Sequence, residues 1–417
     1  MPPDQNSALD DLLIGVATYL EPSDNDRSVA ENRYRLLKEV LERETSPFRD
    51  LLDGPNARIY AQGSVATSTV IVNGAETDRF DVDAIVQCSF PSDWTEDQVL
   101  DLLYSTLENF PGAVEVERCT RCVQVRFAYM HLDVTPLDRN GPIHIEHAGE
   151  IYHSPDDGIS GRVPANPFGF SLWYRSVLGQ PSASFEEGIA ERRVQGMVDR
   201  LRQDEAERSF HILADAEQDD LPKFLPARLD VPQAIALKLL KRFLNRYYAD
   251  LEFKRPPSIY LAKVSGESAV SSDSVLTNVM ALTSNIESRL LTALKAGRRV
   301  FESNPTYEPD IITDRWPKSA RDMEVLASAC RRLSEELSIA AHLELKKMVD
   351  TLERLFGERV GKHVRDEIKS RYDNRAGDKS TRVQLGTGLV MPAIGIRGPD
   401  QINIPKHNFH VGIRKRK

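Results

Sequence analysis

Apolar positions follow two different spacings along the chain, which changes from short strand-like runs to helical periodicity near residue 185. The predicted strands are Ala57–Ala61, Arg79–Cys88, Ala113–Cys119, Val123–Ala128 and His131–Pro136. Helical spacing precedes these strands at residues 27–46 and interrupts them at residues 93–110, where Ser92 or Asp93 would cap the helix. Residues 140–169 have neither period, so we expect an irregular connection there.

The second half of the chain is predicted to be helical, with no further strands. Helical periodicity covers residues 186–203, 232–248, 258–266, 274–296 and 321–356. Strands followed by helices favour an α+β fold with two lobes and a central cleft. We therefore expect a core over residues 1–180, a helical lobe over residues 181–356 and a tail over residues 357–417.

The end of the chain, from about residue 384, differs from both lobes. Glycine and proline interrupt any helix there, while short apolar pairs such as Leu389–Val390 persist. Two interpretations stay open: an extended tail packed over the body, which is the simpler one, or a peptide that adds a strand to a partner protein.

The composition is that of a globular protein, with 41% hydrophobic and 28% charged residues among 417. No run approaches the roughly 18 apolar residues of a membrane span, and the acidic N-terminal segment is unlike a signal peptide. Four cysteines in a chain of this length do not make a disulfide scaffold. The sequence therefore predicts a cytoplasmic protein.

The net charge of −9 is unevenly distributed. Residues 357–417 carry +8, so residues 1–356 carry −17. An acidic body argues against a protein whose main task is to grip a long nucleic acid, because that affinity comes from many cation–phosphate contacts. It still allows a small phosphorylated ligand held beside a metal ion.

An Asp-Val-Asp run in a predicted strand carries the clearest chemical signal. Because side chains alternate along a strand, Asp81 and Asp83 point to one face. Two carboxylates forced together repel each other unless a cation lies between them, and Mg²⁺ is bound by carboxylates together with substrate phosphates. A strand with one wet face has the same alternation, so the pair alone does not establish a metal site.

Two more features support a phosphate-handling site. Gly63-Ser64 lies 17 residues before the acid pair, between a predicted strand and a Ser/Thr-rich segment. Backbone N–H groups and the Ser64 hydroxyl there can donate to phosphate oxygens. Asp133 is a single acid in a later strand; if the two acidic strands are neighbours, three carboxylates converge and can hold two metal ions for an in-line displacement.

This combination resembles the signature of polymerase-β-like nucleotidyltransferases, and in detail that of the CD-NTase family. CD-NTases are bacterial cyclic-oligonucleotide synthases of antiphage defence, related to cyclic GMP-AMP synthase and oligoadenylate synthase. The resemblance covers about residues 27–300 and includes Asn166-Pro167 and Phe170–Trp173, which are similar to the family's segment between core and lobe. It implies a core built on a mixed sheet.

The resemblance also implies roles for residues outside the acids. Gln62, Gly63 and Ser64 would grip phosphates, and Lys241 and Ser258 would contact the donor nucleotide's phosphates.

Considered without the resemblance, the lysine and the serine have simpler explanations, and these stay open. Lys238 and Lys241 would form a solvated helix face, and Ser258 would cap a helix.

The sequence also departs from the family that it resembles. Ile259 stands where relatives often place a base-stacking tyrosine, which makes Tyr260 the candidate for stacking.

The implied activity is a metal-dependent joining of nucleoside triphosphates, ATP or GTP, into a cyclic di- or trinucleotide. A linear dinucleotide intermediate forms and pyrophosphate leaves. Asp81, Asp83 and Asp133 would hold two Mg²⁺ or Mn²⁺ ions. The implied context is bacterial antiphage signalling, with a regulatory protein binding the tail, no membrane and no strong nucleic-acid grip. The alternatives are nucleotide transfer to RNA or to a protein side chain, and a catalytically silent binding or scaffold module.

Other polar clusters carry weaker signals. Cys119 and Cys122 have zinc-like spacing, which Cys88 or His131 would have to complete, and ordinary thiols are the simpler interpretation. The histidines expected on the surface are His144, His147 and His153.

Overall fold

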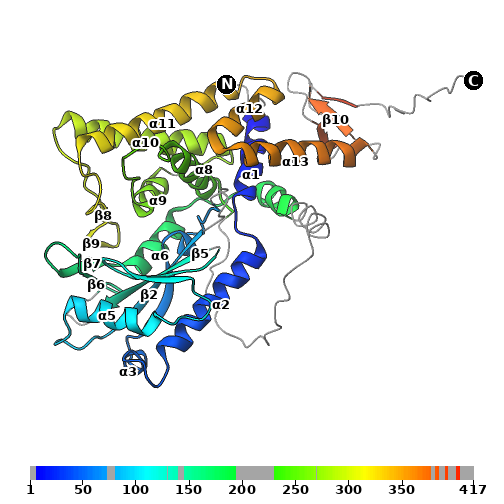
Figure 1. Ribbon diagram of the computed structural model, residues 1–417. Coiled ribbons are helices and arrows are strands. Elements are labelled where there is room, and N and C mark those ends of the chain that lie inside the picture. The colour runs from blue at the N-terminus through cyan, green and yellow to red at the C-terminus, as the bar shows by residue number, and fades with distance from the viewer. Residues whose placement is uncertain are drawn as a thin grey trace, which may run out of the picture.

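The strands of the first half of the chain form one seven-stranded mixed sheet (Figure 1). The computed structural model describes residues 6–72, 80–128, 130–139, 145–193, 230–268, 270–376, 381–384, 390–392 and 401–403. The strands of the sheet are β1 Arg58–Gln62, β2 Phe80–Cys88, β3 Glu115–Arg118, β4 Val123–Arg126, β5 Met130–Asp138, β6 Gly149–His153 and β7 Gly161–Ala165. Their order is β1-β2-β5-β4-β3, with β6 on β5 and β7 on β6. Only the β2–β5 pair is parallel among these described strands.

One face of this sheet is covered by two helices. Alternate residues of the central strands, such as Val82 and Val134, are fully buried against α2 (Asp24–Leu41) and α5 (Glu96–Leu107). The cap of α5 is Thr95, whose side chain accepts from the Gln98 N–H, so the predicted caps Ser92 and Asp93 are wrong. Burial of the apolar set directs the polar set of the same strands to the opposite face.

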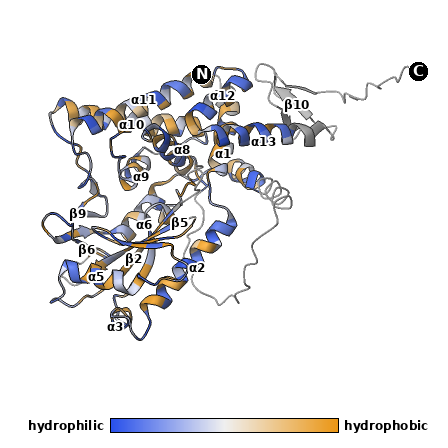
Figure 2. Cartoon of the chain, in the orientation of Figure 1, coloured by the Kyte–Doolittle hydropathy of each residue, from blue (hydrophilic) through white to orange (hydrophobic). Residues whose placement is uncertain are grey.

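The second lobe is a helical bundle around the larger apolar cluster. Its helices are α1 Asn6–Tyr19, α6 Pro167–Val177, α8 Pro232–Tyr247, α9 Ser258–Glu267, α10 Val275–Lys295, α11 Ala320–Ala340, α12 Leu345–Phe356 and α13 Glu358–Ala376. Hydrophobic and hydrophilic positions share these helices, as expected of amphipathic helices packed on one core (Figure 2). None of the described helices has the length and apolar content of a membrane span.

Both ends of the described chain contribute to this bundle. Leu9 and Leu13 of α1 belong to its core, although the N-terminus precedes the sheet in sequence. Helix α13, within residues assigned to the tail from sequence, packs on α12 and α1. The short strands β10 Thr381–Gln384, β11 Val390–Pro392 and β12 Gln401–Asn403 pair with one another. The rest of the tail lies outside the described residues, so both interpretations of it stay open.

Several sequence predictions are corrected by long-range pairing. The segment 140–169, expected to be irregular, contains β6 and β7, which add to the sheet through β5. The predicted helix 321–356 is two helices, α11 and α12. An unexpected hairpin, β8 (Ser303–Asn304) with β9 (Tyr307–Ile311), also forms in the helical half. Residues 183–193 are helical as predicted, and the remainder of the 186–203 prediction lies outside the described residues.

A buried ion pair joins the end of α1 to the middle of α8. Lys238 Nζ lies 2.6 Å from Glu21 Oε1, and the two side chains are 4% and 7% exposed. Arg193 donates to both Glu21 oxygens at 2.9 and 3.0 Å. Burial alone would raise the pKa of Glu21, but Lys238 and Arg193 lower it to about 2. Lys238 is therefore a structural residue, and its assignment to a solvated face is wrong.

We predict that Glu21→Gln destabilises the protein by about 3 kcal/mol or more, because it leaves the buried Lys238 ammonium without a carboxylate. The lowered pKa means that the wild-type contribution is complete above the ordinary value of 4.5 and is lost as pH falls toward about 2. Urea unfolding from pH 7 to pH 3 should therefore show a steeper acid loss for the wild type than for the variant. Glu39→Gln, which breaks an exposed pair with Arg35, is the control and should cost at most about 0.5 kcal/mol. Equal losses in the two variants would contradict the assignment.

Candidate functional site

The three strand acids lie on the sheet face that α2 and α5 leave uncovered. In the parallel β2–β5 pair, Asp83 is directly opposite Asp133, and Asp81 is opposite His131. Asp83 and Asp133 are partly buried and Asp81 is exposed. The two acidic strands are thus neighbours in a register that places their carboxylates on one face.

Burial, together with the repulsion between the acids, raises the pKa values of Asp83 and Asp133. Burial, followed by the charges of Asp133 and Asp81, raises the pKa of Asp83 to about 8, against a smaller opposing effect of Lys241. Burial and Asp81 likewise raise the pKa of Asp133. A hydrogen bond from Gln124 Nε2 to Asp133 Oδ1, 2.8 Å long, works in the opposite direction. Concentrated negative charge of this kind favours a bound cation.

The donor set fits a hard divalent cation that also binds phosphate. Carboxylate oxygens are the ligands that Mg²⁺ and Mn²⁺ prefer, usually completed by substrate phosphates and water. Within the described residues, no three His, Cys, Asp or Glu side chains are grouped closely enough to hold a metal by themselves. The described carboxylates therefore do not form a closed protein cage for a metal.

The Gly-Ser turn lies against the acid face. Gln62 ends β1 opposite Asp83, and the short helix α4 (Gly63–Ala66) follows directly. Gly63 has φ +60°, and a Cβ there would collide with Asp83 Oδ2, so both backbone conformation and space require glycine. Arg175 of α6 supports the turn from behind through hydrogen bonds of 3.2 and 3.3 Å to Ala66 O. The turn and the carboxylates thus form one continuous surface.

Lys241 reaches this surface from the helical lobe. Its Nζ donates a 2.9 Å hydrogen bond to Thr69 O, just after the turn. Burial lowers the pKa of Lys241 to about 8, while Asp83 and Asp81 act in the opposite direction. The interpretation of Lys241 as part of a solvated face is therefore wrong, since its ammonium lies within the field of the acids.

Ser258 begins α9, and α9 packs against α4. The N-cap residue is Pro257, without a side-chain cap, so Ser258 is not the helix cap. Its side chain is exposed. Tyr260, in contrast, is fully buried and its ring packs 5.5 Å from that of Trp316. The assignment of base stacking to Tyr260 is wrong, because its ring belongs to the core of the lobe.

Sequence reasoning missed the residues that support the site. Gln124 faces Asp133 across the β4–β5 ladder, and Arg126 donates to Gln124 Oε1 at 2.7 Å. Alternation in the Val123–Arg126 run places both polar side chains on one face, but their partner depends on strand order. No pattern in the sequence around Arg175 indicated that this residue supports the turn.

The remaining polar clusters do not build a second centre in the described part of the chain. The four cysteines are free, and no zinc-like group forms around Cys119 and Cys122. His147, expected on the surface, is buried against Phe168, with ring centroids 4.1 Å apart. His153 accepts a 3.0 Å hydrogen bond from Arg121, and His144 lies outside the described residues.

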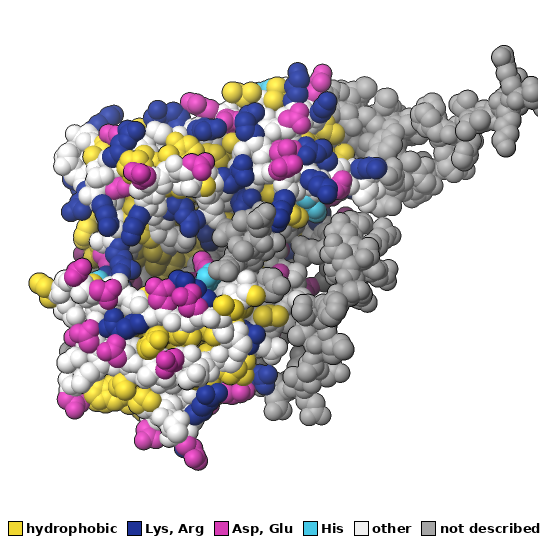
Figure 3. All heavy atoms as spheres, in the orientation of Figure 1, with side chains coloured by type: hydrophobic (Ala, Val, Ile, Leu, Met, Phe, Trp, Pro, Cys, Tyr) yellow, Lys and Arg dark blue, Asp and Glu magenta, His cyan; other side chains and the backbone are white. Residues whose placement is uncertain are grey.

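The space-filling view shows a hollow between the two lobes (Figure 3). Lys and Arg side chains gather on its helical-lobe side, and Asp and Glu side chains gather on its sheet side. A mixed sheet with strand acids beside a Gly-Ser turn, faced by a helical lobe, defines the polymerase-β-like nucleotidyltransferase fold.

Comparisons with known proteins narrow this class. No protein-family model matches the chain. It is 28% identical over 395 residues to the cyclic dinucleotide synthase CdnG of Bradyrhizobium diazoefficiens, covering 92% of this chain and 89% of that protein. The structure of the B. diazoefficiens CD-NTase CdnG in complex with GTP matches with a TM-score of 0.70 at 26% identity, covering 87% of this chain and 99% of that chain. The chain is thus similar in sequence and in fold to CD-NTases, and it is a nucleotidyltransferase.

We predict that Gly63→Ala nearly abolishes turnover, because the new Cβ displaces Asp83. Gly297→Ala is the matched control: it has φ +63°, but no atom lies within 4 Å of its added Cβ. Both substitutions should cost about 1 kcal/mol of backbone strain in thermal unfolding. Only the first should remove activity, and equal activities would show that the contact with Asp83 is unimportant.

A second prediction concerns Asp83 in metal-free buffer. Because its pKa is raised from 3.8 to about 8, the folded state holds a proton that the unfolded state releases, so wild-type stability falls as pH rises across this interval. Asp83→Asn should stabilise the metal-free protein by about 1–3 kcal/mol at pH 8, and by less near pH 4. Asp93→Asn, at an exposed position, should change little. Thermal unfolding with EDTA across this range measures the difference, and a destabilised Asp83→Asn protein would refute the repulsion.

Proposed function

We propose that this chain joins nucleoside triphosphates, ATP or GTP, into a cyclic di- or trinucleotide, with release of pyrophosphate, as a signal in bacterial antiphage defence. The observation that carries the proposal is the parallel register of Asp83 and Asp133 beside the Gly63-Ser64 turn, with Lys241 reaching the same turn from the other lobe. The similarity to CdnG, a cyclic dinucleotide synthase whose structure is known in complex with GTP, supports nucleotide substrates.

Each site residue has a role that follows from its position. Two Mg²⁺ or Mn²⁺ ions bound by Asp81, Asp83 and Asp133 would supply Lewis-acid stabilisation of the attacking and leaving oxygens. Asp133, oriented by Gln124 and with a raised pKa, lies where the acceptor ribose hydroxyl loses its proton.

The phosphates are held from both walls of the hollow. Gln62, Gly63 and Ser64 bind donor phosphates through the turn, while Lys241 and Ser258 neutralise and orient them from the lobe. Gln62 Nε2 also donates to Thr135 Oγ1 at 3.4 Å, which keeps its side chain on the acid face. After the first bond, the linear dinucleotide turns round for the second.

The wider assignments follow from the same proposal. We keep the division into a core over residues 1–180, a helical lobe over residues 181–356 and a tail over residues 357–417, with α1, α6 and α13 packing in the bundle of the lobe. In this proposal the tail binds a regulatory protein. The enzyme acts in the cytoplasm.

Incubation of the protein with all four triphosphates and Mg²⁺ or Mn²⁺, followed by mass spectrometry, tests the function directly. We expect a cyclic product from nucleotides alone, and at least about a thousandfold loss in Asp83→Ala because the metal ligands act together. Asp93→Ala, at an exposed position, should retain full activity. A product that appears only after addition of RNA or a protein would instead indicate transfer to that acceptor.

A further inference from the structure

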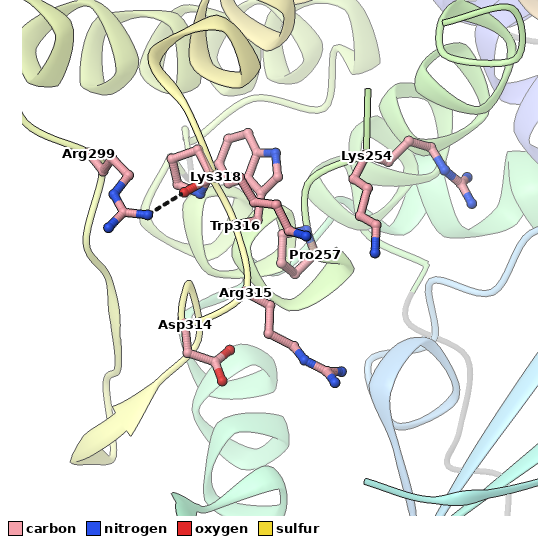
Figure 4. A pocket seen from close by; sticks show the side chains of 9 residues that line it. Lys254, Pro257, Arg299, Asp314, Arg315, Trp316 and Lys318 are labelled. Carbon is pink, nitrogen blue, oxygen red and sulfur yellow. Dashed lines mark hydrogen bonds between the residues drawn. The ribbon is translucent and has the colours of Figure 1, made fainter. Parts of the chain in front are cut away.

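A pocket of about 520 Å³ opens at the start of α9 (Figure 4). Its walls come from the α8–α9 connection and from the segments flanking the β8–β9 hairpin. The lining cations are Lys254, Arg255, Arg299, Arg315 and Lys318. A single acid, Asp314, and the apolar groups of Pro257, Trp316 and Pro317 complete the lining.

Most of this positive charge is not neutralised by the protein. Asp314 is paired with Arg121 of the β3–β4 turn. Arg299 donates one hydrogen bond, 3.3 Å long, to Pro317 O. Across the described ranges no carboxylate pairs with Lys254, Arg315 or Lys318, and all three side chains are exposed. A pocket with this surplus attracts an anion of several charges.

The pocket adjoins the proposed active site at two points. Pro257 lines it, and the next residue is Ser258 at the start of α9. The charge of Arg255, which also lines it, acts on Lys241.

On the other side, the Arg121–Asp314 pair fixes the Arg315 segment to the β3–β4 turn. Cys122 of this turn lies within the electrostatic reach of Arg315 and also of Asp133 and Asp83. The pocket cations therefore face the same region as the carboxylates.

We propose that this basic pocket binds the 5′-triphosphate of the acceptor nucleotide during the first bond formation and releases it to the donor site when the linear intermediate turns round for the second. The inference rests on the proposed function, in which the turn and Lys241 are occupied by donor phosphates. An acceptor triphosphate brings about four further negative charges next to three carboxylates, so it needs counter-charge on the opposite wall. Arg315, Lys318 and Lys254 provide that charge, and Trp316 with Pro257 supplies an apolar wall.

The proposal is tested by a cycle of four reactions in which the charge of the pocket and the charge of the acceptor are removed separately and together. The wild type and the double variant Arg315→Ala/Lys318→Ala are given a labelled triphosphate donor and, as acceptors, the nucleoside triphosphate and the unphosphorylated nucleoside. We expect the wild type to prefer the triphosphate acceptor, and the variant to lose at least about tenfold of this preference. The rate with the unphosphorylated nucleoside should fall much less than the rate with the triphosphate acceptor. Lys346→Glu, an exposed lysine on α12, is the matched control and should behave as the wild type.

Binding without chemistry provides the second measurement. In EDTA, inorganic tripolyphosphate should bind the double variant at least about tenfold more weakly than the wild type. Arg315→Lys/Lys318→Arg, which keeps the charges, should restore both readouts, and equal melting temperatures exclude misfolding. If the double variant keeps the preference for the triphosphate acceptor, the assignment of the pocket is wrong, although the proposed activity is not contradicted. A wild type that makes no dinucleotide from any acceptor overturns the proposed function and the acceptor assignment with it.

Discussion

The parallel pairing of β2 with β5 is the constraint on which the rest of the structure depends. Its register places Asp83 beside Asp133 and simultaneously turns Val82 and Val134 toward α2 and α5. A slip of one residue would bury the carboxylates and expose the apolar set, so hydrophobic burial on one face holds like charges together on the other. The core thereby opposes the repulsion between the carboxylates.

The helical lobe contributes the opposite charge through two lysines one turn apart. Lys238 is anchored by its buried pair with Glu21, whereas Lys241 extends to Thr69 O beside the turn. Both contacts hold α8 against other segments, and the Lys241 ammonium lies within the field of Asp83 and Asp81. A structural ion pair and the lysine nearest the acids thus share one helix.

Local patterns in the sequence predicted those features of the structure that depend on residues close together in the chain. Alternation placed Asp81 and Asp83 on one face, and the α+β class with a mixed sheet is confirmed. Features created by distant partners could not be predicted in this way. Burial of Tyr260 depends on Trp316, and strands β6 and β7 depend on the free edge that β5 offers. The roles of the site residues stay predictions, because position alone does not show chemistry.

The unexpected β8–β9 hairpin explains how the two charged walls stay in place. Asn304 Nδ2 donates to Asn166 O at 2.9 Å, and Asp310 accepts from the Asn166 N–H at 2.9 Å, so the hairpin is bound to the residue that joins core and lobe. The Arg121–Asp314 pair adds a second connection to the sheet. These contacts hold the pocket segment against the sheet, while no carboxylate among the described residues pairs with Lys254, Arg315 or Lys318. Under the proposed function, a metal-bound nucleotide would bring positive charge to the carboxylates and negative charge to these cations, so that one ligand would satisfy both walls.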